Sequence, residues 1–307
     1  MKKYSESVKL MGNNFAITVV AANTRVAKAN IDLAITEMKR IEQVFTTYKP
    51  DSQTNLINDN AGIKPVVVDN EVFALIERSV GISKITQGAF DISYGSIDKS
   101  LWNFDKEMTQ LPSLEEAKKI VHLIDYRNIV LNKEAGTVFL KEKGMRIGFG
   151  GIGKGYAAEM AKKVLLQNGI KSGIINASGD LTAWGSQPDG KPWTIGIANP
   201  DFPQEAFSYL EISNKAVATS GNYEKYVMIG GKKYSHTIDP KTGLPITGIK
   251  SVTIISDNAE FADAMATPIS VMGINAGLFL INQIPDLHCI IIDDNNKLYT
   301  SKNINLQ

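Results

Sequence analysis

The chain has 307 residues, and its 33 lysines and arginines against 32 aspartates and glutamates leave a formal net charge of +1. This balance argues against a broad nucleic-acid-binding surface or a polybasic membrane anchor. The length and a hydrophobic content of 43% predict a sizeable core, in one large domain or two intimate lobes. The single cysteine, Cys289, excludes an internal disulfide and a cysteine-rich zinc site.

Histidines are also sparse, since the sequence has three of them: His122, His236 and His288. A three-histidine metal centre would need all of them. We therefore expect any bound metal to have oxygen ligands, which suits magnesium or calcium.

The N-terminal segment carries two lysines, Lys2 and Lys3, as a signal peptide would, but the charged residues Glu6 and Lys9 come soon after them. No apolar stretch follows these charged residues, so the sequence as written predicts no signal peptide. No run approaches the roughly 20 apolar residues that span a bilayer. The lone cysteine is compatible with either an oxidising or a reducing compartment.

Hydrophobic periodicity divides the chain into strands and helices. In its first half it predicts a strand over 15–20, helices over 26–45 and 71–86, a helix capped by Ser113 with Glu116 three residues on, and a helix over 154–167. In its second half it predicts strands over 173–177, 193–197, 207–212, 216–219, 225–229 and 251–256, helices over 261–272 and 276–282, and a strand over 287–292. Because strands and helices do not strictly alternate, the order favours an α+β fold over a doubly wound α/β fold. A soft boundary lies near 141–148, without a flexible linker.

A glycine-rich turn at 148–155 holds five glycines in eight residues and precedes the predicted helix over 154–167. Glycines allow close approach of a ligand and expose N–H groups at a helix N-terminus, and Lys154 adds a positive charge. The spacing matches neither a dinucleotide fingerprint nor a P-loop. The turn is therefore either a phosphate site or a tight strand-to-helix connection.

Near the C-terminus, Asp263 and Thr267 are spaced i, i+4 on a predicted helix, so both oxygens lie on one face. A carboxylate and a hydroxyl form a partial shell for Mg²⁺. Without further context, an aspartate that stabilises a helix dipole is the stronger interpretation.

The third polar feature is a strand that runs into a turn at 234–245 and places His236 at a loop edge. Asp239 either orients this histidine or caps the turn through its own backbone. The polar turn at 218–223 either binds a ligand or links strands. The other two histidines look structural, and Cys289 looks like a buried, inert thiol.

Eight short segments occur one after another in a specific order. They are Met11-Gly12-Asn13; Phe45 to Tyr48 with Ser52 and Asn58; Gly88 to Asp91; Gly150 to Ala157; Asn176 to Asp180; Thr219 to Tyr223; His236 to Pro240 with Gly243 and Pro245; and Ala262 to Thr267. Together they resemble the ApbE-type flavin transferases, the FAD:protein FMN transferase family. Each segment is a weak signal, but the ordered set is highly specific and spans most of the chain.

The resemblance implies an architecture related to the tunnelling fold, with mixed, mainly antiparallel sheets flanked by helices and FAD in a cleft. It implies Mg²⁺-dependent transfer of FMN from FAD to a serine or threonine hydroxyl of an acceptor flavoprotein, with release of AMP. Magnesium ligands fall on the Gly151 carbonyl, the Asp263 carboxylate and the Thr267 hydroxyl. FAD contacts fall on Met11, Tyr48, Ala89, Phe90, Asp91, Lys154 and the backbone at Thr237.

The resemblance also implies roles in the reaction. His236 either accepts the proton of the attacking hydroxyl or stabilises the pyrophosphate. Lys154 supplies electrostatic stabilisation, and Asp180 is the third position expected at the catalytic centre. Tyr48 stacks on an aromatic part of FAD. Members of the family are often exported and lipid-anchored, which implies a periplasmic location for a full-length form.

The chain departs from the family pattern at Gly148, where an aspartate is usual, and at Asn13, where a threonine is usual. The missing carboxylate bears on FAD affinity and on the balance between transfer and hydrolysis. Two alternatives therefore stand beside the transferase: an FAD pyrophosphatase that yields FMN and AMP, and a non-catalytic FAD-binding protein. A Rossmann dehydrogenase is excluded, because its fingerprint and the acidic residue about 20 positions later are missing.

Overall fold

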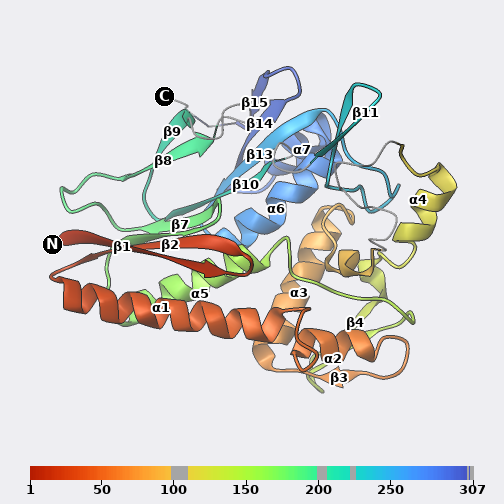
Figure 1. Ribbon diagram of the computed structural model, residues 1–307, viewed down its shortest axis with the longest axis horizontal. Coiled ribbons are helices and arrows are strands. Elements are labelled where there is room, and N and C mark those ends of the chain that lie inside the picture. The colour runs from red at the N-terminus through yellow and green to blue at the C-terminus, as the bar shows by residue number, and fades with distance from the viewer. Residues whose placement is uncertain (98–109, 199–205, 222–225, 303, 305–307) are drawn as a thin grey trace.

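An eight-stranded antiparallel sheet organises the structure, a computed structural model that describes residues 1–307 except 98–109, 199–205, 222–225, 303 and 305–307 (Figure 1). The strands lie in the order β1 (Lys2–Leu10), β2 (Asn13–Ala21), β6 (Gly173–Ala177), β7 (Asp180–Trp184), β10 (Lys215–Gly221), β13 (Ile249–Ser256), β14 (His288–Asp293) and β15 (Leu298–Thr300). The fold is thus α+β, as the order of elements predicts.

Three helices cover one face of this sheet: α1 (Thr24–Phe45), α5 (Gly153–Gln167) and α6 (Ala259–Met272). Alternate residues of β2, such as Phe15 and Ile17, point into this layer and are fully buried. The opposite face packs on the hairpin of β8 (Trp193–Ala198) and β9 (Ala206–Ile212), where Trp193 joins Leu181 in a second core. Figure 1 shows α1 and the β8–β9 hairpin on opposite sides of the sheet.

Smaller elements surround these layers. They are α2 (Gln53–Asp59), β3 (Val66–Val67), α3 (Asn70–Ile85), the 3₁₀ helices η1 (Ile92–Ser96) and η2 (Tyr126–Asn128), α4 (Leu114–Val121), β4 (Ile129–Asn132), β5 (Thr137–Leu140), β11 (Tyr226–Ile229), β12 (Lys232–Ser235) and α7 (Ile274–Ile281). Strands β3, β5 and β4 form a small antiparallel sheet, and β11 pairs with β12. No helix in the described part of the chain is both long and apolar enough to cross a membrane.

The predicted helices are present, with ends within two residues of those expected, and Ser113 and Glu116 form a capping box at α4. The sequence patterns missed several elements: the strands β1, β3, β4, β5, β7 and β15, the helix α2 and both 3₁₀ helices. Strand β1 lies at the edge of the sheet and exposes alternate polar residues, so it carries no apolar run. The predicted strand over 225–229 is β11, although Lys225 itself lies outside the described residues.

A polar network ties α5 to α3 and α1 beside the core. The Tyr156 hydroxyl donates to Glu71 Oε1 at 2.6 Å, and the Arg40 guanidinium donates to both oxygens of Glu71 at 2.6 and 2.8 Å. These hydrogen bonds, those from Arg40 foremost, hold the pKa of Glu71 below its ordinary value. Ionised Glu71 therefore stabilises the packing of three helices.

Replacing Glu71 with glutamine should lower the free energy of unfolding by about 1–2 kcal/mol at pH 7. Because the folded-state pKa of Glu71 is depressed, its contribution is present above the ordinary value of 4.5 and is lost as the pH falls below it. Denaturant unfolding of both proteins should thus differ at pH 7 and differ less at pH 3.5, where the pH has fallen toward the depressed folded-state pKa of Glu71. Glu115→Gln is the control, because Glu115 forms only an exposed pair with Lys119. An equal difference at both pH values would contradict this account.

Candidate active site

A cavity of about 1050 Å³ lies where the ends of several elements meet on the helix-covered side of the sheet. This volume is at the upper end for small-molecule sites and suits a large ligand. Its lining comes from the β1–β2 turn, the end of α1 and the loop after it, the segment from Ala89 to Ile97, the turn before α5, the loop after β12, and α6. Nearly all the residues singled out from the sequence line it: Met11, Tyr48, Ala89, Phe90, Asp91, Gly151, Lys154, His236, Thr237 and Thr267.

Two glycine-containing hairpin turns position parts of this site. Met11-Gly12 joins β1 to β2, and Ser178-Gly179 joins β6 to β7. All four residues have positive φ, between 50° and 97°, as a two-residue hairpin turn with the twist of the flanking strands requires. The first turn places Met11 at the cavity, and the second places Asp180 at the start of β7.

A buried charged cluster lies beside the cavity. The Lys154 ammonium forms an ion pair with Asp180, and Asp263 on α6 accepts a hydrogen bond from the Gly155 N–H at 2.9 Å. Asp180 is 2% exposed and Asp263 6%. Burial, and next the charge of Asp180, raise the pKa of Asp263 to about 7, against the opposing effect of Lys154.

With both carboxylates ionised, this cluster of two carboxylates and one ammonium has an excess of negative charge, which protonation of Asp263 or a bound cation would relieve. Thr267, one turn after Asp263, and Gly151, just before α5, line the adjacent cavity. Carboxylate, hydroxyl and carbonyl oxygens are the donors that Mg²⁺ prefers, so the residues present fit that ion. Among the described residues, no group of three or more His, Cys, Asp or Glu side chains is arranged to hold a metal. Any metal shell here therefore combines different oxygen donors.

Asp263 also stabilises a helix, though not its own. It lies in the second turn of α6, and its carboxylate caps the N-terminus of α5. The dipole interpretation of the sequence was therefore right about the chemistry but assigned it to the wrong helix.

Gly155 brings these two helices together. A Cβ added there would overlap the carbonyl oxygen of Ala259 and lie 2.8 Å from the Cβ of Asp263. Glycine at this position lets α5 approach α6 closely enough for the Gly155 N–H to reach the carboxylate.

Gly155→Ala should therefore push α5 away from α6 and lower the free energy of unfolding by about 1–3 kcal/mol. We also expect it to weaken any stabilisation of the fold by Mg²⁺. Thermal unfolding with and without the ion measures both effects. The control is Gly150→Ala. An added Cβ at Gly150 would meet open space, so this variant should unfold like the wild type. Unchanged unfolding of Gly155→Ala would show that the helices can separate without cost.

The apolar and aromatic side of the cavity contains Ala89 and Phe90, both 6% exposed, and Tyr48, which is 92% exposed. The Asp91 carboxylate accepts hydrogen bonds from the Ser93 N–H at 2.8 Å and the Tyr126 N–H at 2.7 Å. Burial nonetheless raises the pKa of Asp91. Asp91 thus shapes this wall through the start of η1, while Tyr48 offers an exposed aromatic ring.

His236 lies on the loop after β12 and lines the cavity, as does Ser220 at the end of β10. The Thr237 N–H donates to Ser235 Oγ at 2.9 Å, so this part of its backbone is used within the loop. Asp239 accepts from the Lys241 N–H at 2.9 Å and from the Thr242 hydroxyl at 3.2 Å. Of the two roles open for Asp239, these contacts favour capping the turn. Asn222 and Tyr223, part of the polar turn noted in the sequence, lie outside the described residues.

The remaining residues that carried expectations lie away from the cavity. His122 is exposed at the end of α4, and His288 begins β14. Cys289 is fully buried, which raises the pKa of its thiol, in agreement with an inert side chain.

Sequence reasoning missed Glu42, Tyr94 and Arg146, which also line the cavity. Glu42 accepts a hydrogen bond from the Met11 N–H at 2.9 Å and so links α1 to the β1–β2 turn. The sequence does contain a signal for Glu42: it is a charged residue one turn after buried Met38, on the helix face that the apolar periodicity assigns to the core.

At Gly148 the backbone does not require glycine. Its φ is not in the left-handed region, and an added Cβ would meet only Thr47 Cγ2 at 3.9 Å and Gly95 Cα at 4.0 Å. A side chain fits at this edge of the cavity. The fold therefore does not require glycine at position 148, and the lack of a side chain there leaves this edge of the cavity without a functional group.

Comparison with known proteins agrees with this geometry. The model of the ApbE family matches residues 11–291. The chain belongs to the ApbE family. Among its relatives, the FAD:protein FMN transferase of Klebsiella pneumoniae (strain 342) is 29% identical over 300 residues, which cover 97% of this chain and 92% of the relative.

Solved ApbE structures have the same fold as this family member. The ApbE protein of Thermotoga maritima superposes with a TM-score of 0.88 at 30% identity, covering 98% of this chain and 97% of that one. The flavin transferase ApbE of Vibrio cholerae superposes with a TM-score of 0.83 at 25% identity, covering 98% and 97% of the two chains. The mixed, mainly antiparallel architecture expected from the resemblance is confirmed.

Proposed function

We propose that this ApbE-family protein transfers FMN from FAD to a serine or threonine hydroxyl of an acceptor flavoprotein and releases AMP. The observation that carries the proposal is the large cavity next to the buried Lys154–Asp180–Asp263 cluster. The cavity is large enough for a dinucleotide. In the adjacent cluster, Lys154 can face the negative charge of the pyrophosphate and the carboxylates can hold a cation. Nearly full-length relatives named FAD:protein FMN transferase support the same reaction.

Asp263, Thr267 and the Gly151 carbonyl are the residues that would hold Mg²⁺. When bound, the ion supplies neutralisation of the negative charge that develops on the pyrophosphate and on departing AMP. Asp180 is not assigned to this set, and it pairs with Lys154. Its role is to hold the lysine ammonium at the rim of the cavity.

FAD is seated by the other lining residues. Tyr48 provides an exposed ring for stacking, and Ala89, Phe90 and Asp91 line the same cavity. Met11, the Lys154 side chain and Thr237 complete the set of contacts. Lys154 contributes positive charge near the phosphates, where the pair with Asp180 keeps it oriented.

In the reaction, the acceptor hydroxyl oxygen attacks the phosphorus on the FMN side of FAD. A new P–O bond forms to the acceptor, and the bond between this phosphorus and the bridging oxygen breaks, so AMP leaves with that oxygen. His236 lines the cavity and takes the proton of the attacking hydroxyl. With water as the nucleophile, the same steps yield free FMN and AMP.

Incubation of the protein with FAD, Mg²⁺ and a flavoprotein acceptor tests the proposal. We expect mass spectrometry to find the acceptor heavier by one covalently bound FMN, and chromatography to find an equal amount of AMP. AMP without an acceptor adduct would identify a pyrophosphatase. Bound FAD that stays intact would identify a storage protein. Either result would overturn the proposed transferase activity.

A further inference from the structure

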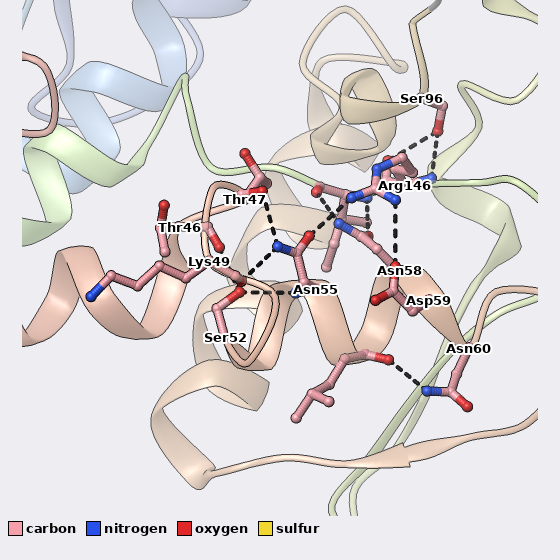
Figure 2. Close-up of polar contacts among 12 residues, drawn as sticks. Thr46, Thr47, Lys49, Ser52, Asn55, Asn58, Asp59, Asn60, Ser96 and Arg146 are labelled. Carbon is pink, nitrogen blue, oxygen red and sulfur yellow. Dashed lines mark hydrogen bonds and ion pairs between the residues drawn. The ribbon is translucent and has the colours of Figure 1, made fainter.

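Two walls of the FAD cavity are connected through a helix that lies behind them. One wall is the loop 46–49, which carries Tyr48, and the other is the segment 146–151, which leads into α5. Helix α2 contributes no residue to the cavity lining, yet its polar side chains bond to both segments (Figure 2).

Asn58 holds the second wall. Its Oδ1 accepts a hydrogen bond from the Ile147 N–H at 2.7 Å, and its Nδ2 donates to the Ile147 carbonyl at 3.1 Å. The side chain thus satisfies both backbone groups of one residue, as a neighbouring strand would. Asn58 is 4% exposed, so no water can readily replace these bonds. They fix the backbone immediately before Gly148.

Asn55, one turn earlier on α2, holds the first wall. Its Nδ2 donates to the carbonyls of Thr47 at 2.9 Å and Lys49 at 2.7 Å, the two residues that flank Tyr48. Its Oδ1 accepts from Arg146 Nη2 at 2.9 Å, which reaches it from the second wall. Asn55 is 6% exposed, and Figure 2 shows it between the loop and Arg146.

The second wall is also held from its other side. Ser96 Oγ donates to the Arg146 carbonyl at 2.9 Å and accepts from the Arg146 N–H at 2.8 Å. The Gly148 N–H donates to the Ile92 carbonyl at 2.9 Å. With this side anchored to η1, α2 determines how far the Tyr48 loop lies from the glycine-rich turn.

We propose that Asn55 and Asn58 are positioning residues for FAD: they set the separation between Tyr48 and the glycine-rich turn, and with it the affinity for the dinucleotide. The inference rests on the proposed function, because it assigns FAD to this cavity. Removing either amide would leave buried carbonyl or N–H groups unpaired and let one wall shift relative to the other. The two proposed side-chain ligands of the metal, Asp263 and Thr267, lie on α6, and Asp263 accepts its hydrogen bond from Gly155 of α5 rather than from α2, so their arrangement should persist.

The test uses Asn58→Ala and Asn55→Asp in the full chain, with Asn60→Ala as the matched control. Asn60 is on the same helix end and donates to a carbonyl, that of Leu56 at 2.8 Å, but it reaches neither wall. Asn55→Asp keeps the volume and the acceptor for Arg146 but removes the donor to Thr47 and Lys49. Flavin fluorescence gives the Kd for FAD, steady-state kinetics give KM and kcat, and thermal unfolding gives the stabilisation by Mg²⁺.

We expect both variants to raise the Kd and KM for FAD about tenfold, with kcat and the Mg²⁺ stabilisation within about twofold of the wild type. Asn60→Ala should bind FAD like the wild type. A purely structural role would lower the unfolding temperature without this split between KM and kcat. If Asn58→Ala does not fold, Asn55→Asp decides the question, since it retains side-chain volume.

The outcomes separate this inference from the proposed function. Unchanged FAD affinity in the folded variants, while the wild type binds FAD, would overturn the positioning role alone. A fall in kcat at unchanged affinity would overturn it as well. A wild type that binds no FAD would overturn the proposed function, and the inference with it.

Discussion

Asp263→Asn should reduce FMN transfer by about a thousandfold and remove the stabilisation of the fold by Mg²⁺. Asp263 is the buried carboxylate in excess over Lys154, and its replacement removes the charge that would balance the cation. A loss of several kcal/mol of charge stabilisation has this size, at about 1.4 kcal/mol for each factor of ten. Transfer is measured as FMN bound to the acceptor, and stabilisation as the shift in unfolding temperature on adding Mg²⁺.

The matched control for this variant is Asp257→Asn. Asp257 immediately precedes the N-cap of α6 but is exposed and pairs with Lys215 at the surface. It should leave both the transfer rate and the Mg²⁺ effect unchanged. If Asp263→Asn retained a full response to Mg²⁺, the ion would have to bind elsewhere and the proposed ligand set would be wrong.

His236→Asn should lower kcat by about 10²- to 10⁴-fold, the usual contribution of a positioned proton acceptor. Asparagine keeps a polar side chain of similar reach but takes up no proton at neutral pH. Because the other residues that line the cavity, among them Tyr48 and Phe90, are unchanged in this variant, the Kd for FAD should change little. Single-turnover transfer and flavin fluorescence measure the two quantities separately.

His122→Asn is the control for this substitution, since His122 is exposed at the end of α4. It should behave as the wild type in both assays. If His236→Asn instead weakened FAD binding and left kcat unchanged, His236 would serve the pyrophosphate rather than the proton. Both expected losses arise from side chains that the sequence placed in separate motifs.

Much of the fold was predictable because its signals are local. The helices α1, α3, α5 and α6 each carry an apolar stripe at a period of 3.6 residues, which short-range analysis detects. Strand β1 was missed because it is an edge strand whose side chains alternate between exposed and partly buried. Helix α2 was missed because it has only seven residues, too few for a periodic pattern.

Three parts of the candidate site were named from motifs with their own local chemistry, namely the glycine-rich turn, the helix with Asp263 and the turn with His236, and the other residues came from the family resemblance. The sequence by itself determined that Lys154 begins a helix and that His236 lies on a loop, whereas Met11 and Asp180 were named only through the family resemblance. Asp263 and Thr267 were placed on one helical face by spacing alone.

Only the tertiary structure decided which of these residues meet. Gly155 and Asp263 are 108 positions apart, and Asn58 and Ile147 are 89 apart. Their contacts depend on how helices and sheet pack, because a periodic pattern reports which face of an element is buried and not which partner covers it. The pairing of Lys154 with Asp180, and the use of Asp263 to cap α5, result from that packing. The sequence thus determined the chemical groups, and close packing around Gly155 and α2 determined the site that they form.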